Sequence, residues 1–487
     1  MAGLVSAAVA QTHAPAGRAL SLQDCIAAAL QHNFDVRVER LEPVKSQIGL
    51  QAAYSGYDPT FNISGTHHFN NQPTGAVDQY QRPIPGTVSD QNAFNSGLGG
   101  TLPWGLTYDF SGNISEQYGS SASSPFDHSG GSIGVTLSQP LLKNFWIDST
   151  RLAVRAAKNQ IRLSEQGLRQ QLITTVTAVE NAFYELIYAH ENLTVEQQAL
   201  DLAQTQLDQD RQRVSVGSLA PLDVQQDEAQ VAQSRANLIA AQFTLASDEN
   251  ALKNLISDSY LNWHDARIEP VGTLQAVRQL FDVQDSWTKG LAGRPDLLQA
   301  KLNLEQQGIQ LKYDRNQIFP ELDLVGSYGF NGADTEFSGT FAGLNEGNAA
   351  FYSYGAQLKM PLGNVQARNA LKADRAIEQQ ELLKLKQLEQ NVMVQIDDAV
   401  KQAQSAWESV DATREARIYA EAALDAEQKK YAVGKSTTFT VLQLQNNLTA
   451  ARSQEIRALA NYNEALSNLA EQEGSTLQRR NVDLTAK

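Results

Sequence analysis

The chain of 487 residues contains one cysteine and three methionines. It also has no apolar run as long as the ~18 residues that a transmembrane helix needs. A single cysteine excludes a disulfide within the chain. Cys25 lies among small and apolar residues at helical spacing, which predicts a buried structural thiol, and the polar Gln23-Asp24 before it argues against lipidation. If the protein spans a membrane, it must do so with strands.

Positive charge is also in short supply, since 39 Lys and Arg stand against 54 Asp and Glu, for a net charge of −15. This balance disfavours nucleic acid as a partner, because the phosphate backbone is itself anionic. The seven histidines are scattered, and the pair His67-His68 has no acidic or thiol cluster beside it. The glycines of residues 97–105 are not followed by a phosphate-loop helix, and no Ser/His/Asp grouping is evident. We therefore expect no metal, no cofactor and no enzyme.

The first residues are typical of part of an export signal. Met1–Ala10 is small and apolar, and Ala8-Val9-Ala10 suits a signal-peptide cleavage site. The apolar stretch is short and no basic residue precedes it. We interpret residues 1–19 as the remnant of an export signal or a disordered N-terminus.

The chain contains a long internal repeat. Val214–Gly217 and the helix after it correspond to Tyr431–Gly434, 217 residues later, and Leu137–Leu141 corresponds to Leu358–Leu362. Each half reads helix, strand, strand, very long helix, Val-Gly turn, helix, which indicates a structure built by duplication. The predicted organisation is a first repeat at 20–256, an equatorial connector at 257–285, a second repeat at 286–473 and a polar C-terminal tail at 474–487.

Apolar residues recur at every seventh position through the longest helices. From Leu172 to Val214 the series has no gap, and alanines keep the adjacent position small. A sustained period of seven predicts helices that supercoil around neighbours. We expect long helices at about 151–214 and 367–431, each a rod of about 95 Å, with partner helices at about 221–256 and 439–471. The second series comprises Leu382, Ile396, Ala403, Val410, Leu424 and Tyr431.

Strict alternation of apolar and polar residues marks four strands, at 61–69, 133–139, 322–330 and 352–359. Their length suits transmembrane β-strands. Four strands cannot close a barrel, and open edges cannot face lipid, so membrane insertion would demand oligomerisation. Aromatic residues gather at the strand ends, as in an interfacial girdle: Tyr54, Tyr57, Phe145, Trp146, Tyr313, Phe319 and Phe351.

One alternating hairpin has no counterpart in the second half. Phe94–Leu102 and Leu106–Ile114 are joined by Pro103-Trp104-Gly105. The pattern leaves three places open for this hairpin: it extends the barrel, caps it outside the cell, or folds into the lumen.

From Leu20 to about Glu473 the chain resembles the TolC family of bacterial outer-membrane channels. The marks that carry the resemblance are Tyr57-Asp58-Pro59, Gln139-Pro140-Leu141-Leu142 and the two Val-Gly turns. The resemblance implies a mixed α+β membrane protein, a homotrimer in which four strands per chain form one shared β-barrel continued by a long α-helical periplasmic tunnel. It further implies a periplasmic adaptor (membrane fusion) protein and an inner-membrane pump as partners, in efflux or type I secretion, with the pump choosing the cargo.

The resemblance also assigns roles to residues at matching positions. Asp223 and Tyr431 occupy the positions of a gate link at the periplasmic tip, although a helix-dipole role for Asp223 and simple packing for Tyr431 are equally open. Thr440 and Gln443 stand where the family archetype has two acidic residues that line the constriction. Pro140 and Pro361 lie where strand passes into helix, a switch that proline tolerates because no donor is needed there. The adaptor-contacting tip turns would comprise Val216, Gly217, Ser218, Val433, Gly434 and Lys435.

Two other classes of protein compete with the outer-membrane duct. A soluble coiled-coil scaffold with β-hairpin insertions would show the same heptads, but it does not account for the alternating strands. A periplasmic adaptor would need a compact lipoyl-like or barrel domain beside one helical hairpin, and no such segment is found.

Overall fold

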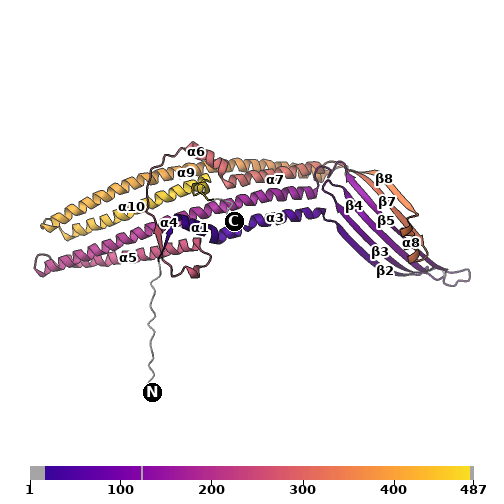
Figure 1. Ribbon diagram of the computed structural model, residues 1–487, viewed down its shortest axis with the longest axis horizontal. Coiled ribbons are helices and arrows are strands. Elements are labelled where there is room, and N and C mark those ends of the chain that lie inside the picture. Colours follow the sequence, from indigo (N-terminus) through magenta and orange to yellow (C-terminus); the bar gives the residue numbers. More distant parts are fainter. Residues whose placement is uncertain (1–16, 122–123, 483–487) are drawn as a thin grey trace, which may run out of the picture. The chain divides into compact units, whose positions relative to one another are not determined.

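The computed structural model describes residues 17–121 and 124–482, which divide into two compact units (Figure 1). The helical unit comprises the described residues up to Pro43, Ser164–Ala300 and those from Lys384 onward. The sheet unit comprises Val44–Leu163 and Lys301–Leu383. Each unit takes residues from both predicted repeats. The predicted export signal at Met1–Ala10 lies outside the described residues.

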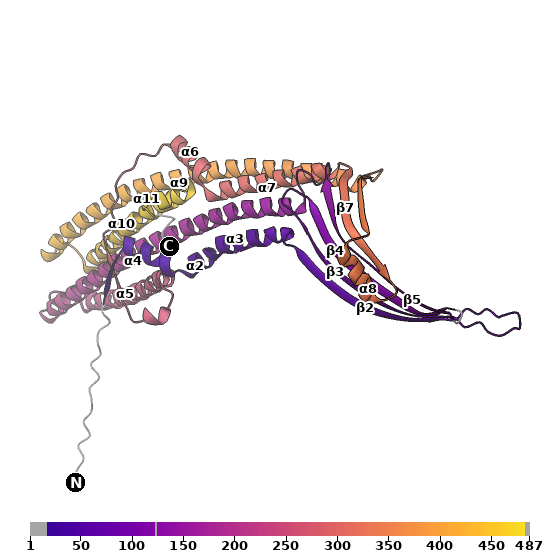
Figure 2. The ribbon, with the colours of Figure 1, turned by 45° about the vertical axis from the view of Figure 1, so that its right-hand side comes forward.

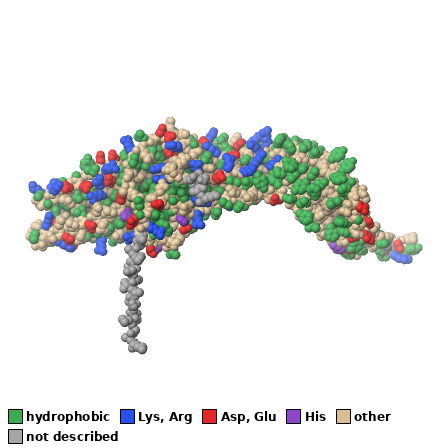
Figure 3. Space-filling model, viewed as in Figure 1, with side chains coloured by type: hydrophobic (Ala, Val, Ile, Leu, Met, Phe, Trp, Pro, Cys, Tyr) green, Lys and Arg blue, Asp and Glu red, His purple; other side chains and the backbone are tan. Residues whose placement is uncertain are grey.

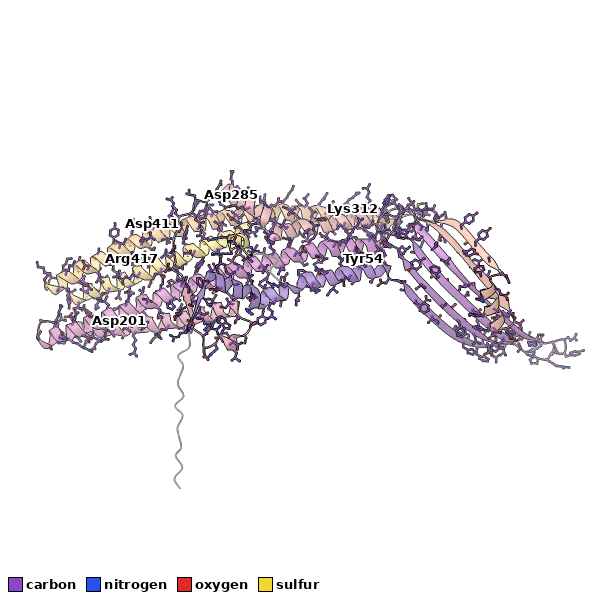
Figure 4. The ribbon with its side chains drawn as sticks, in the orientation of Figure 1. Tyr54, Asp201, Asp285, Lys312, Asp411 and Arg417 are labelled. Atoms are coloured by element: carbon purple, nitrogen blue, oxygen red, sulfur yellow. The ribbon has the colours of Figure 1, made fainter. Side chains whose placement is uncertain are left out.

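Two pairs of helices carry the heptad pattern. Helix α4 (Ser149–Ser215) precedes α5 (Pro221–Ile256), and α9 (Val365–Ala432) precedes α10 (Thr438–Glu473). The boundaries predicted from the sequence are confirmed to within two residues. Figures 1 and 2 show α5 beside α4 and α10 beside α9. Arg211 pairs with Glu228 at 2.8 Å across the first helix pair, and Arg417 (Figure 4) pairs with Glu455 across the second.

The predicted seam residues are buried along most of both long helices. In α4 the buried set includes Leu172, Val179, Leu186 and Leu207, and in α9 it includes Ile396, Ala403, Val410, Leu424 and Tyr431. Leu382 is an exception, because 43% of it is exposed. A heptad period marks a face of a helix, but it does not say at which points another segment covers that face.

The core of the helical unit gathers several short elements around α4 and α5. Helices α1 (Leu22–His32) and α2 (Phe34–Glu39) pack here, and Cys25 is fully buried, as predicted. Burial raises the pKa of the Cys25 thiol to about 12. None of the described helices has a stretch long and apolar enough to cross a membrane.

The predicted connector and tail are both folded onto the helical unit. In the connector, β6 (Ile268–Val271) pairs in parallel with β1 (Arg18–Ser21) after the short 3-10 helix η2 (Tyr260–Asn262), and α6 (Val283–Gly293) follows. In the tail, α11 (Thr476–Arg479) buries Leu477, and Arg480 pairs with the buried Glu180. The described part of the tail is therefore packed against the helices.

The sheet unit holds one antiparallel sheet that has six strands in the described part of the chain. Their order is β2 (Thr60–Gln72), β3 (Thr87–Thr101), β4 (Thr107–Ser121), β5 (Ser124–Pro140), β7 (Glu321–Asp334) and β8 (Ala350–Lys359). The expectation of four strands per chain was wrong for this sheet. The unmatched hairpin forms β3 and β4 and lies between β2 and β5, because its backbone pairs with both neighbours along its whole length. All four strands predicted from alternation are confirmed.

The two faces of the sheet differ in chemistry. Cross-strand partners share a face, and one register row reads Phe61, Leu98, Phe110, Val135, Tyr328, Tyr352 across all six strands. The adjacent row on the opposite face reads Thr60, Gly99, Asp109, Thr136, Ser327, Ser353. Figure 3 shows hydrophobic side chains gathered over the strands, whereas charged side chains are frequent over the helices.

The last turns of two helices lead into the sheet within the same unit. Helix α3 (Leu41–Tyr54) and the 3-10 helix η1 (Ser55–Tyr57) precede β2, and α7 (Pro295–Gln317) precedes β7. Figure 4 marks Tyr54 and Lys312 close to where these strands begin. Tyr54 and Phe319 are 43% and 47% exposed and Trp146 is 74% exposed, as aromatic residues in an interfacial girdle would be.

Helix α8 (Phe337–Glu346) lies on the apolar face of the sheet. The Phe337 ring meets Phe94 edge-on at 5.6 Å, and the fully buried Thr340 passes so close to Gly332 that a side chain at Gly332 would collide with its carbonyl. Phe341 on the same helix is 65% exposed, so α8 adds apolar surface of its own to this face.

Candidate functional site

The two Val-Gly turns end α4 and α9 with the same hydrogen bonds. Ser218 N–H donates to Arg213 O and Gly217 N–H to Val214 O, both at 2.9 Å. At the second turn Lys435 N–H donates to Lys430 O at 2.9 Å and Gly434 N–H to Tyr431 O at 3.0 Å. This pair of bonds is the Schellman motif, which needs a left-handed residue after the helix. Gly217 and Gly434 have φ of 76° and 73°, which glycine adopts without strain.

The turns present apolar side chains to their surroundings. Val216 is 77% exposed and Val433 68% exposed, although both are β-branched aliphatic residues. A matched pair of exposed valines at the ends of two helical hairpins is a surface that a partner could cover.

The helices that follow the turns begin differently. Helix α5 starts with Pro221 at its first position, and no side chain caps it. Helix α10 starts after Thr437, whose hydroxyl accepts from Thr440 N–H at 3.3 Å. Thr440, a predicted constriction position, therefore also takes part in a helix cap. Gln443, the other one, is exposed on α10.

The hydroxyl of Tyr431 joins the second hairpin to the first. It donates to Asp210 Oδ2 at 2.8 Å and lies 2.9 Å from the hydroxyl of Thr438. Tyr431 is at the end of α9, Thr438 at the start of α10 and Asp210 near the end of α4, so three helices meet at one phenol. All three side chains are buried, and burial raises the pKa of Tyr431, so the phenol remains a proton donor at neutral pH.

Asp210 has further partners that fix its position. Gln206 donates to the same carboxylate oxygen at 2.7 Å, and Arg213 lies 3.6 Å from the other oxygen. The Arg213 guanidinium also stacks over the Tyr431 ring at 4.6 Å from its centre. The tyrosine is therefore held through its hydroxyl and through its ring.

A second carboxyl group, that of Asp227 on α5, is buried beside Asp210. In the described part of the chain neither of its oxygens accepts a hydrogen bond, and Asp210 Oδ1 accepts none either. Burial, reinforced by the Asp210 carboxylate and then by Asp223, raises the pKa of Asp227 to about 7. Two carboxyl groups placed in this way are stable when they share one proton.

The acceptor of Tyr431 differs from the one predicted from the sequence. Among the described residues the tyrosine bonds to Asp210, whereas the predicted Asp223 is half-buried in the first turn of α5 and influences the cluster through Asp227. One signal pointed to Asp210. In the seam of α4 it occupies the position taken by Ala182, Ala189 and Ala203 one or more heptads earlier, and a charged residue at a seam position calls for a partner.

A second cluster in the helical unit also places two carboxyl groups side by side, those of Glu185 and Glu464. Arg457 donates to both oxygens of Glu185 at 2.6 and 2.7 Å and stacks over Tyr188. Burial and the nearby Glu185 raise the pKa of Glu464 to about 7. Among the described residues, no group of three or more His, Cys, Asp or Glu side chains is arranged to hold a metal ion.

The predicted strand-to-helix prolines lie at the ends of strands. Pro140 is the last residue of β5, and Pro361 follows β8 by two residues. Residues 141–148 then lead to α4 and residues 362–364 to α9. Pro140 therefore ends a strand and Pro361 lies between strand and helix, and a backbone donor is dispensable at both positions.

Comparison with known proteins gives one family. The family model of the outer membrane efflux protein matches residues 25–257 and 288–475. The outer membrane efflux protein BepC of Brucella suis is 25% identical over 330 residues, which cover 67% of this chain and 68% of that protein. The outer membrane protein TolC of Escherichia coli is 25% identical over 302 residues, or 59% of each chain.

A solved structure shares the fold over nearly the whole chain. The Campylobacter jejuni CmeC outer membrane channel aligns with a TM-score of 0.69 at 15% identity, covering 96% of this chain and 90% of that one.

Proposed function

Because the chain belongs to the outer membrane efflux protein family, whose members are outer-membrane channels, we propose that it is the exit duct of a tripartite efflux or type I secretion assembly. Three copies would enclose a barrel in the outer membrane and a helical tunnel in the periplasm. Substrates would pass from the tunnel to the outside by passive conduction. A periplasmic adaptor protein and an inner-membrane pump would supply cargo and energy, and the pump would select the cargo.

The observation that carries the gating part of the proposal is the contact of Tyr431 with Asp210. This bond connects the α9–α10 hairpin to α4 beside the turns that end both hairpins. In the proposed closed state it keeps the hairpins together at the periplasmic end. A hydrogen bond to a charged group is worth about 1.5–3 kcal/mol, which is enough to hold a two-state gate closed and small enough for a docking partner to overcome.

Opening would separate α9 and α10 from α4 at this point. An adaptor that covers the exposed Val216 and Val433 only when the hairpins are apart would favour the open state, because a ligand shifts a two-state equilibrium by its difference in affinity for the two states. The exposed side chains at the turns include the apolar Val216 and Val433 and the polar Ser218 and Lys435, so they offer both apolar and polar contact.

Recording from the purified protein in planar lipid bilayers tests this function. We expect discrete, ohmic currents without ATP, small in the closed state, from protein recovered in the outer-membrane fraction. Protein that fractionates with the outer membrane but never forms a channel, even when the Tyr431–Asp210 bond is removed, would contradict the proposal.

A further inference from the structure

The hairpin of β3 and β4 is a full part of the sheet. Each strand pairs over 13 to 15 residues with both of its neighbours, from Thr60 opposite Gly99 to Ser121 opposite Ser124. Its tight end at Leu102–Leu106 is closed by Gly105, with φ of 92°. A cap or a plug outside the sheet would not have this continuous pairing.

The apolar face continues through the hairpin. Leu98 and Phe110 lie between Phe61 on β2 and Val135 on β5 in one register row, and they are 40% and 53% exposed. The opposite face carries polar residues on the same strands, among them Asn113, which accepts from the Ser132 hydroxyl at 2.5 Å. One exposed apolar face and one polar face are what lipid on one side and water on the other require.

The apolar face ends at a polar row. His67, Asn92, Glu116, Ser129 and Asp334 occupy this row, and His67 and Asn92 lie 2.9 Å apart. On β7 the apolar band runs from Leu322 to Gly332, the last residue on this face before the polar row. It spans about 33 Å along the strand, which is about 25 Å across a membrane at the tilt usual for barrels. This is the height of the apolar band in outer-membrane barrels.

The sheet has two open edges, β2 and β8, and both carry apolar side chains. Ile63 on β2 is 75% exposed, and Tyr352 and Tyr354 on β8 are 75% and 85% exposed. Unpaired backbone groups cannot face lipid. Since every neighbouring pair in the six-stranded sheet is antiparallel, β2 runs opposite to β8. The β8 edge of one copy therefore matches the β2 edge of another in an antiparallel ladder.

We propose that β3 and β4 are membrane-spanning strands, and that β2 of one chain pairs with β8 of a second copy, so that each chain contributes six strands to the shared barrel. This rests on the proposed function, in which three copies form the ring, and it then gives eighteen strands. Barrel diameter grows roughly linearly with strand number, so the barrel would be about 1.5 times as wide as a twelve-stranded barrel. The outer-membrane opening would then be wide, and the helical turns would set the narrowest point of the duct.

Thiol labelling in intact outer membranes tests the position of the hairpin. We expect a membrane-impermeant thiol reagent to label Ser111→Cys from the lumen and to leave Phe110→Cys unlabelled. On β3 we expect it to label Asn95→Cys and to leave Leu98→Cys unlabelled. On β5, Thr136→Cys and Val135→Cys serve as the matched control, since β5 spans the membrane with or without the hairpin. Labelling of both β4 positions with Val135→Cys protected would overturn the inference and leave the proposed function standing. Labelling of Val135→Cys as well would contradict the proposed function itself.

Disulfide cross-linking tests the junction between copies. One cysteine replaces Ser64 on β2 (Ser64→Cys), and the other is placed in turn on β8 as Ser353→Cys, Gly355→Cys or Gln357→Cys. All four positions lie on the polar face of the sheet. One of the three pairings should give reducible dimers and trimers. Ser64→Cys with Tyr354→Cys places the thiols on opposite faces and should give none. The native Cys25 is buried and adds no background. A cross-link within a single chain, or none from any pairing, would overturn the closure by a second copy.

Discussion

The phenol oxygen of Tyr431 lies 2.8 Å from a carboxylate oxygen of Asp210, although 221 residues separate them in the chain. One residue ends the long helix of the second half and the other lies near the end of the long helix of the first. Their contact is the point at which a gate can be tested with the smallest change to the protein.

Tyr431→Phe removes the hydroxyl and retains the ring over Arg213. A buried hydrogen bond to a charged group contributes about 1.5–3 kcal/mol, so we expect the open-to-closed ratio in bilayer recordings to rise by about tenfold or more. Tyr419→Phe is the matched control, because Tyr419 is 70% exposed on the same helix. Asp210→Asn combined with Tyr431→Phe should add less than the two single changes together. Equal closed-state currents in the wild type and Tyr431→Phe would remove the gate role.

The buried pair Asp210 and Asp227 predicts a pH dependence of the gate. The pKa of Asp227 is raised from 3.8 to about 7 in this structure, which we propose is the closed state, and hydration in the open state would restore the ordinary value. The closed state then binds more protons, so its advantage is complete below pH 3.8, falls as pH rises toward about 7 and changes little above that.

Recordings at pH 5 and pH 8 should therefore show more open channels at pH 8. Asp227→Asn should abolish most of this difference, because the amide can donate to Asp210 at every pH. Asp425→Asn, which changes an exposed carboxyl near the same end of α9, should leave it intact. An unchanged pH response in Asp227→Asn would show that another group titrates with the gate.

The second turn predicts a local cost for Gly434→Ala. A non-glycine residue at φ of 73° is strained, by about 1–2 kcal/mol. Amide hydrogen exchange at residues 433–435 should accelerate roughly tenfold. Gly308→Ala is the control in the interior of α7, where an added Cβ meets nothing within 4 Å and should stabilise the helix by about 0.5–1 kcal/mol. Unchanged exchange at the turn would mean that the motif does not hold the end of α9.

The thiol of Cys25 should be inert while the protein is folded. It is fully buried and its pKa is raised to about 12, so the reactive thiolate is scarce. Maleimide labelling should be slow in detergent and complete after denaturation. Rapid labelling of the folded protein would place Cys25 outside the core.

The sequence predicted the helices and strands well because their signals are local. The heptads from Leu172 to Val214 continue without interruption, and alternation along 322–330 separates an apolar from a polar face. Alternation assigns a face to each residue and not a neighbour to each strand. The order β2-β3-β4-β5 therefore could not be deduced from the sequence. The sequence left three positions open for the hairpin, and the structure shows it within the sheet.

The acceptor of the Tyr431 hydroxyl was missed for a related reason. Asp223 was assigned from a matching position in a family, whereas the hydrogen bond depends on which carboxylate the packing of α4 and α5 brings to Tyr431. Asp223 and Asp227 are one helical turn apart on α5. The acceptor lies on α4 instead, where Asp210 continues the seam series of Ala182, Ala189 and Ala203 and was the one local signal that pointed to it.

Electron cryomicroscopy of the full-length protein, extracted with detergent from the outer-membrane fraction, tests the account most directly. We predict a particle of three copies with three-fold symmetry, a detergent belt around the strands, and a closed end at which Tyr431 contacts Asp210. A rod that stays soluble without detergent and lacks three-fold symmetry would contradict the account, and a coiled-coil scaffold would then describe the protein better.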